Sequence, residues 1–254
     1  MDLDVLDVIP GRLHMFRFPI GQAYLWRDGE ELTLIDAGNK DAAAGIEEAI
    51  RSRGLRPENI RRIVLTHCHR DHVGAAQELA DRHGAEIVAH RLDAPVIRGE
   101  QPVPEPVLLD WERPLYAHGL TVPPAPPTRV DREAEDGDLL GFGDGARAVH
   151  SPGHTDGSIA VHLPHHGVLF TGDCVAGVGQ VMLGVFNTDR ERALESFRRL
   201  AALAPATACF GHGDPLTDDA AEILRASADR ASADQPSAHQ ASADRDSGLQ
   251  IEHG

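Results

Sequence analysis

Cysteine, lysine and aromatic residues are scarce in this sequence of 254 residues, and long apolar runs are missing. The three cysteines, Cys68, Cys174 and Cys209, are odd in number and suggest no disulfide framework, so a reducing compartment is expected. No stretch approaches the roughly 18 consecutive apolar residues of a membrane-spanning helix. The acidic start, Met1 to Asp7, is unlike the basic start of a secretory signal. We therefore expect a cytoplasmic protein without a membrane partner.

Positive charge is also scarce, since Lys40 is the only lysine and the formal net charge is -16. An acidic domain repels phosphate backbones, so nucleic acid is not expected as a partner. Hydrophobic residues make up 41% and charged residues 25%, which fits a globular protein with ample core. The expected partner is a small-molecule substrate, and a homodimer is left open.

Alternating helix and strand patterns predict one folded domain over residues 1–225. Strand patterns occur at 11–36, 63–65, 86–89, 147–149, 159–161, 168–170 and 206–210. Helical spacing follows at 40–53, 73–83, 189–203 and about 217–227. The order predicts a mixed α/β fold with a sheet edge where several strands end.

Two segments depart from this pattern. Residues 99–128 hold eight prolines, which should exclude regular helix and central strand, and their apolar residues favour a lid. Residues 226–254 contain a five-residue Ala/Ser/Asp-rich repeat with too little apolar surface to offset its ordering entropy. We expect a disordered tail there, although its first part could instead extend the last helix.

Four predicted strands each lead into a potential metal ligand. The residues are His67, His154, Asp173 and His212. Strand ends on one edge of a sheet converge, and loops there hold functional groups on a rigid scaffold. The chain is rich in histidine, with 15, and a lone histidine is more often an ordinary surface or core residue. Seven ligand-type residues at or just after strand ends, namely these four with His69, Asp71 and His72, are much harder to explain in that way.

The segment from His67 to His72 supplies four of these ligands. His67 and His69 are two residues apart, so in an extended segment they face one side and can hold one ion. Asp71 and His72 lie where the chain turns into a helix and can face a second ion. Asp173 has two carboxylate oxygens and can bridge both. Nitrogen and oxygen ligands suit zinc, and also iron or manganese.

These motifs resemble the metallo-β-lactamase-fold hydrolase superfamily over about residues 10–225. The segments that carry the resemblance are Leu34 to Gly38, Thr66 to Gly74, Ser151 to Thr155, Phe170 to Asp173, and Phe210 to Gly213. The resemblance implies a four-layer αββα sandwich with metals at the sheet edge. It assigns His67, His69 and His154 to one metal and Asp71, His72 and His212 to the other, with Asp173 between them. Asp36 would orient ligands.

The resemblance also implies a reaction. Two zinc ions would lower the pKa of a bridging water to about 7, and the resulting hydroxide would attack a polarised carbonyl. Asp71 would hold or take a proton. The expected function is hydrolysis of an ester, thioester or lactone. The aromatic and apolar residues Trp111, Tyr116, Met182, Leu183, Val185 and Phe186 would suit a pocket wall, although such residues are more often core.

Two other functions stay open from the sequence. An iron persulfide dioxygenase resembles this chain at His67 to His69 but uses only the equivalents of His67, His154 and Asp173, with one metal. A metal-stabilised binding protein would hold metal without turnover. Related β-lactamases with a cysteine ligand carry it where this chain has Asp173, and Cys174 should point away if the strand stays extended.

Overall fold

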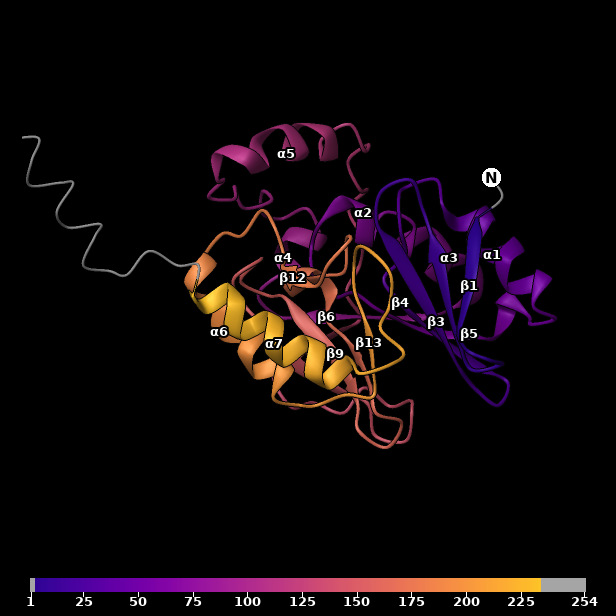
Figure 1. The fold of residues 1–254 in the computed structure, drawn as a ribbon. Helices are drawn as coiled ribbons and strands as arrows, with labels where there is room; N and C mark the ends of the chain where they lie inside the picture. Colours follow the sequence, from indigo (N-terminus) through magenta and orange to yellow (C-terminus); the bar gives the residue numbers. More distant parts are fainter. Residues whose placement is uncertain (1–2, 234–254) are drawn as a thin grey trace, which may run out of the picture.

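The computed structural model describes residues 3–233, and its strands form two main sheets (Figure 1). The first sheet runs in sequence order through β1 (Asp4–Ile9), β2 (Leu13–Arg17), β3 (Gln22–Asp28), β4 (Glu31–Ile35), β5 (Ile60–Val64), β6 (Glu86–His90) and β7 (Arg132–Ala134). The second has the order β13 (Thr207–Cys209), β10 (Val168–Phe170), β9 (Ile159–Leu163) and β8 (Arg147–His150). A two-stranded ribbon pairs β11 (Val175–Ala176) with β12 (Met182–Leu183).

Seven α-helices and three 3₁₀ turns lie between or after these strands within residues 3–233. The helices are α1 (Ala43–Ser52), α2 (Arg70–Val73), α3 (Ala76–His83), α4 (Ala94–Ile97), α5 (Arg113–Gly119), α6 (Arg190–Ala201) and α7 (Ala220–Ala233). The 3₁₀ turns are η1 (Pro57–Asn59), η2 (Asp110–Glu112) and η3 (Gly172–Cys174). None of the helices in this described part is long and apolar enough to cross a bilayer.

The first sheet separates two apolar cores because its side chains alternate between its faces. On β3, Leu25 faces α1 and α3 in what we call the N-terminal core, together with Ile46 and Leu79. Tyr24 and Trp26 face the second sheet in the central core. Neighbouring residues of β3 thus contribute to two different cores.

The second sheet is covered on its other face by α6 and α7. Leu169 of β10 packs there with Phe197 of α6 and Leu224 of α7, in the C-terminal core. The order of layers is therefore helices, sheet, sheet, helices, which confirms the predicted αββα sandwich. The helices expected at 40–53 and 189–203 are confirmed as α1 and α6.

The prediction for residues 99–128 is wrong in one respect, since the segment contains α5 and η2. Proline is tolerated here because Pro114 lies in the first turn of α5, where its missing N–H has no helical partner to lose. The rest of the segment is irregular as expected. Its action as a lid stays a prediction.

The predicted start of a disordered tail at residue 226 is also wrong. Helix α7 continues to Ala233, because Ser227 and Ala228 are buried and small residues allow α7 to pack closely on α6. The alternative that the first part of the tail extends the last helix is the one observed. The rest of the expected tail, residues 234–254, lies outside the described residues.

Candidate metal centre

The seven expected ligands come together at one edge of the two sheets, on loops that follow four strands. His67 and His69 follow β5, and His69 precedes α2, which carries Asp71 and His72. His154 follows β8, Asp173 lies in η3 after β10, and His212 follows β13. Strands β4 and β5 are parallel, as are β10 and β13, so their carboxyl ends meet at this edge. The predicted convergence is confirmed.

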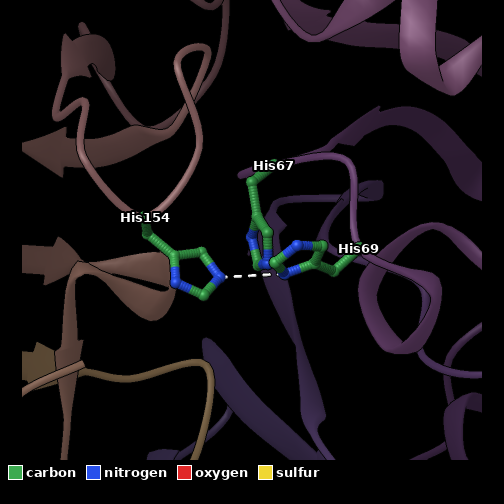
Figure 2. Close-up of side chains that lie close together, drawn as sticks. All are labelled: His67, His69 and His154. Atoms are coloured by element: carbon green, nitrogen blue, oxygen red, sulfur yellow. Dashed lines mark hydrogen bonds between the residues drawn. The ribbon is translucent and has the colours of Figure 1, made fainter. Parts of the chain in front are cut away.

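His67, His69 and His154 form what we call the first cluster (Figure 2). Figure 2 shows the three rings turned toward one another from two different loops, with His154 opposite the other two. His154 Nε2 lies 2.9 Å from His69 Nδ1. Three imidazoles whose nitrogens converge in this way can hold a divalent metal ion.

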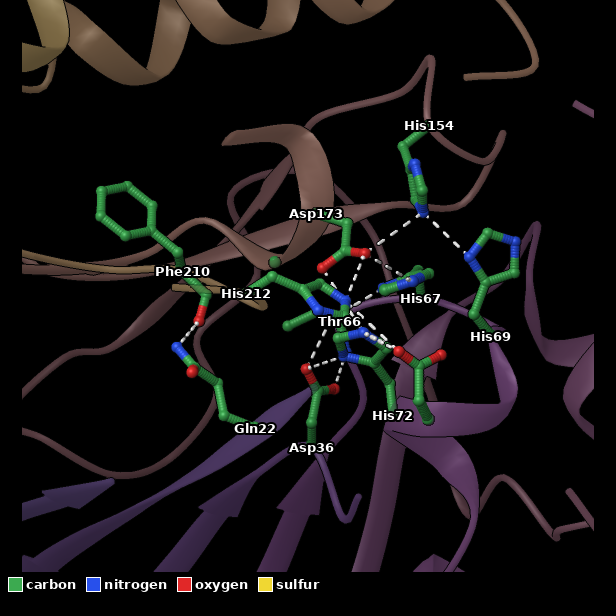
Figure 3. Close-up of polar contacts among 12 residues, drawn as sticks. Gln22, Asp36, Thr66, His67, His69, His72, His154, Asp173, Phe210 and His212 are labelled. Carbon is green, nitrogen blue, oxygen red and sulfur yellow. Dashed lines mark hydrogen bonds and ion pairs between the residues drawn. The ribbon is translucent and has the colours of Figure 1, made fainter. Parts of the chain in front are cut away.

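Asp71, His72 and His212 form the second cluster. Figure 3 shows Asp173 between His154 of the first cluster and His212 of the second. The Asp173 oxygens are 3.7 Å from His154 Nε2 and 3.9 Å from His67 Nε2 on one side. On the other side they are 3.4 Å from His72 Nε2 and 3.2 Å from His212 Nε2. One carboxylate therefore reaches nitrogen atoms of both clusters.

The second ring nitrogen of three ligands is held by another group. His72 Nδ1 is 2.8 Å from Asp36 Oδ2, and His154 Nδ1 is 2.9 Å from the Val185 carbonyl oxygen. The Thr66 hydroxyl donates its proton to Asp36 Oδ2, so it accepts from His67 Nδ1 at 3.0 Å. Such contacts fix the tautomer that leaves Nε2 with a lone pair, which is the form that binds metal.

Three buried polar atoms in the centre have no hydrogen-bond partner among the described residues. They are His67 Nε2, His72 Nε2 and Asp173 Oδ1. Buried polar atoms are normally satisfied, and each exception requires an explanation. All three face the space between the ligands, and the donor set of nitrogen and carboxylate oxygen suits divalent zinc, iron or manganese. The residues present therefore fit metal ions.

The two clusters differ in charge. Burial lowers the pKa of His154 to about 3, with a further contribution from His69, and burial also lowers the pKa values of His67 and His69. Burial opposes the charged form of His212 as well, but Asp173 and Asp71 outweigh it and raise its pKa to about 10. Burial thus favours neutral imidazoles in the first cluster, whereas Asp173 and Asp71 favour a protonated His212 in the metal-free protein, and a bound metal would displace that proton.

Asp36 lies where the sequence placed it, in contact with the ligand segment. Its two oxygens accept from the Thr66 N–H and hydroxyl, both at 2.8 Å, besides contacting His72. Asp36 has a φ of +63°, a left-handed conformation that Asp tolerates better than most residues. This conformation directs the carboxylate from the end of β4 toward the neighbouring loop.

Other residues around the centre were not predicted. The role of Thr66 beside the ligands was missed, although Thr66 directly precedes His67. Gln22 has no local sequence signal, because the Gly213 carbonyl that it contacts is 191 residues away. The reason given for Cys174 is corrected, since η3 is a 3₁₀ turn and not an extended strand. Cys174 still points away, because its Sγ lies 3.7 Å from the Ala193 carbonyl oxygen in α6.

Comparison with known proteins agrees with this geometry. The sequence model described as the metallo-beta-lactamase superfamily matches residues 17–212. The probable metallo-hydrolase YflN of Bacillus subtilis is 30% identical over 206 residues, which cover 72% of this chain and 76% of YflN. A hydroxyacylglutathione hydrolase of Cereibacter sphaeroides is 33% identical over 172 residues, and the match spans 67% of this chain but only 54% of that enzyme.

A solved structure supports the same assignment. A metallo-beta-lactamase family protein from Thermus thermophilus superposes with a TM-score of 0.65 at 25% identity, covering 94% of this chain and 82% of that protein. The family match, the four-layer fold and the converging histidine and aspartate ligands agree with one another. The chain belongs to the metallo-beta-lactamase superfamily and is a metal-dependent hydrolase.

Proposed function

We propose that the protein binds two zinc ions and hydrolyses an ester, thioester or lactone bond of a small molecule. The observation that carries this proposal is the position of Asp173, whose oxygens lie within 3.9 Å of imidazole nitrogens from both clusters. A single carboxylate in this position suits a bridging ligand between two ions. The acidic net charge of the chain argues against a nucleic acid substrate.

The second cluster favours the hydrolase over an iron persulfide dioxygenase. A one-metal enzyme with His67, His154 and Asp173 as ligands has no need for a second group of ligands. Here His212 Nε2 is 3.3 Å from Asp71 Oδ2, and both are close to His72. The three side chains come from helix α2 and from the loop after β13 and converge on the same space, which supports a second metal position.

The chain's own residues have three tasks in this reaction. When bound, the metals supply hydroxide at neutral pH and polarise the carbonyl that is attacked. His67, His69, His72, His154 and His212 hold and orient them, and Asp36 and Thr66 fix two of these rings. Asp71 holds or takes a proton at its carboxylate, which lies beside His212.

The segment 99–128 is the proposed substrate cover. Tyr116 of α5 packs edge-to-face on Phe186 at 5.3 Å between ring centroids, and Phe186 follows Val185, which contacts His154. The segment also receives a hydrogen bond from Arg70 at the Val122 carbonyl. These contacts attach it to α2, which carries two ligands, and to the segment whose Val185 contacts His154, so it is placed to bind the apolar part of a substrate.

The testing experiment is elemental analysis of the purified protein, followed by assays on a panel of esters, thioesters and lactones. We expect two zinc ions per chain and hydrolysis of at least one class. His154→Ala and His212→Ala should each lower the zinc content, whereas His165→Ala, at an exposed hairpin position, should not.

Other results would contradict the proposal in distinguishable ways. About one iron per chain with oxygen uptake would indicate the dioxygenase. Two metals without turnover of any ester, thioester or lactone would indicate a binding protein. Absence of metal after reconstitution would remove the basis of the whole proposal.

A further inference from the structure

Asp93 is a buried carboxylate that belongs to neither ligand cluster. It lies between β6 and α4 and is only 2% exposed. A carboxylate is seldom buried to this extent unless it is paired or well hydrogen-bonded. No cationic side chain is among its hydrogen-bond partners in the described part of the chain, so its contacts must explain its position.

These contacts join the two loops that carry the first cluster. Asp93 Oδ2 accepts from the Cys68 N–H at 2.9 Å, and Cys68 lies between His67 and His69. The same oxygen accepts from the Thr155 hydroxyl at 2.7 Å, and Thr155 directly follows His154. Asp93 Oδ1 accepts from the Gly157 N–H at 2.8 Å.

The second of these loops is shaped to lie close to Asp93. A Cβ on Gly157 would lie 2.5 Å from Asp93 Oδ1 and 2.4 Å from the Asp93 backbone nitrogen, so a side chain would force the two apart. Thr155 is held further by Ser158, whose Oγ lies 2.8 Å from the Thr155 hydroxyl and accepts from the Thr155 N–H at 3.0 Å. The distance between the loops is therefore fixed through Asp93.

We propose that Asp93 is a positioning residue that sets the separation of His154 from His67 and His69, and thereby the metal affinity of the first cluster. Its three partners are all donors, so the site requires a group that only accepts. An amide would place its NH₂ against one of these donors. The inference rests on the proposed two-metal centre.

The second cluster is held in place by residues other than Asp93. An effect of Asp93 on zinc binding by the first cluster alone can therefore be tested. Gln22 Nε2 lies 2.8 Å from the carbonyl oxygen of Phe210, two residues before His212 (Figure 3). It also lies 2.7 Å from the carbonyl oxygen of Gly213, the residue after His212. Tyr24 also contacts the Phe210 backbone. A substitution of Gln22 therefore serves as the matched comparison for the second cluster.

The experiment measures zinc affinity of the metal-free full chain by competition with a chromophoric chelator. His212→Ala leaves the first cluster intact and His154→Ala leaves the second, so Asp93→Asn is introduced into each. We expect roughly a 10- to 100-fold loss of zinc affinity in the His212→Ala background and little change in the His154→Ala background. Gln22→Leu should show the reverse pattern.

A purely structural role for Asp93 predicts a different result. In that case Asp93→Asn would lower the thermal stability of the metal-free protein and weaken both clusters alike, or neither, and the inference would be wrong. Thr155→Val removes a single donor and serves as the test if Asp93→Asn does not fold. A wild-type chain that binds fewer than two zinc ions would overturn the proposed function, whereas unchanged first-cluster affinity in the variant would overturn only this inference.

Discussion

Gly211 lies directly before His212 and against Asp173, in a place where a side chain has no room. A Cβ at this position would lie 1.8 Å from Asp173 Oδ1 and 2.9 Å from His72 Cε1. Gly211→Ala should therefore displace Asp173 and lower hydrolytic activity by about 100-fold, as displacements of about 1 Å can. Zinc content and turnover of the best substrate would measure this.

The control for that change is Gly54→Ala just after α1, outside the metal centre and the proposed substrate cover, where the added Cβ meets no atom within 4 Å beyond its chain neighbours. Gly54 has a φ of +70°, so alanine there should lower the free energy of unfolding by about 1–2 kcal/mol but keep full activity. Equal activity of the two variants would mean that Asp173 does not need its observed position.

Glu47 gives a prediction for pH dependence away from the metal centre. Burial acts to raise its pKa, but hydrogen bonds from Arg82, His83 and Arg51 outweigh burial and lower the pKa. A lowered folded-state pKa contributes stability that is present above the unfolded pKa of about 4.3 and is lost as pH falls through the folded value. Glu47→Gln should thus cost roughly 1–3 kcal/mol at pH 7 and less at pH 3.

Urea unfolding at both pH values would check the Glu47 prediction. Glu48→Gln is the control, since Glu48 is on the same helix but exposed. A loss of stability in Glu47→Gln that is the same at pH 3 and pH 7 would show that the hydrogen bonds do not depend on the charge of the carboxylate.

At the scale of elements, α7 is the one whose length differs most from expectation. Ala228 is 2% exposed and belongs to the C-terminal core, although it lies inside the repeat that was expected to be disordered. Ala228→Asp should lower the unfolding free energy by about 2–4 kcal/mol, because it buries an unpaired charge. Ala226→Asp, at an exposed position on the same helix, should change it by less than about 0.5 kcal/mol.

Thermal and urea unfolding of these two variants would distinguish the alternatives for α7. If Ala228→Asp is as stable as Ala226→Asp, the packing of α7 on α6 beyond residue 225 contributes nothing to the fold. The comparison therefore tests the part of the helix that composition alone would leave out.

Composition and spacing predicted the elements with large apolar residues better than those without them. Ile46 and Ile50 indicated α1 because they are spaced by one helical turn. Both are buried in the structure. Helix α5 was missed because Pro114 was read as excluding helix, although its place in the first turn makes it compatible with one. The extension of α7 was missed because small residues show a helical face only when a partner surface is present.

At the scale of the whole molecule, the metal centre joins two halves of the chain. Residues before 135 supply Asp36 and the segment from His67 to His72, together with the first sheet. Residues after 145 supply His154, Asp173 and His212, together with the second sheet. Bound metal should therefore hold the two sheets together as well as perform chemistry.

Zinc should stabilise the folded protein measurably for this reason. At a free concentration of 100 times Kd, one site adds about 2.7 kcal/mol, which corresponds to a Tm increase of roughly 5–10 °C for a chain of this size. A chelator should reverse the increase, and His154→Ala should reduce it. A Tm that does not respond to zinc or to the chelator would show that metal does not bind to the native state.

The candidate site was more accessible from the sequence than the network around it. The ligands were found because His67, His154, Asp173 and His212 follow apolar strands, and strand order decides which ends meet. Asp93 and Gln22 were missed because their contacts depend on tertiary structure, over 25 to 191 positions of the chain. Local patterns do not contain such information.

The three cysteines can serve as probes of local opening, since each apolar core contains one of them. Cys68 lies in the N-terminal core, Cys209 in the central core and Cys174 in the C-terminal core, and all three are buried. Burial raises the pKa of each thiol, that of Cys174 to about 12, so the reactive thiolate is rare in the native state. Mass spectrometry of thiol alkylation would therefore report, in the unmodified sequence, how often each of the three cores opens.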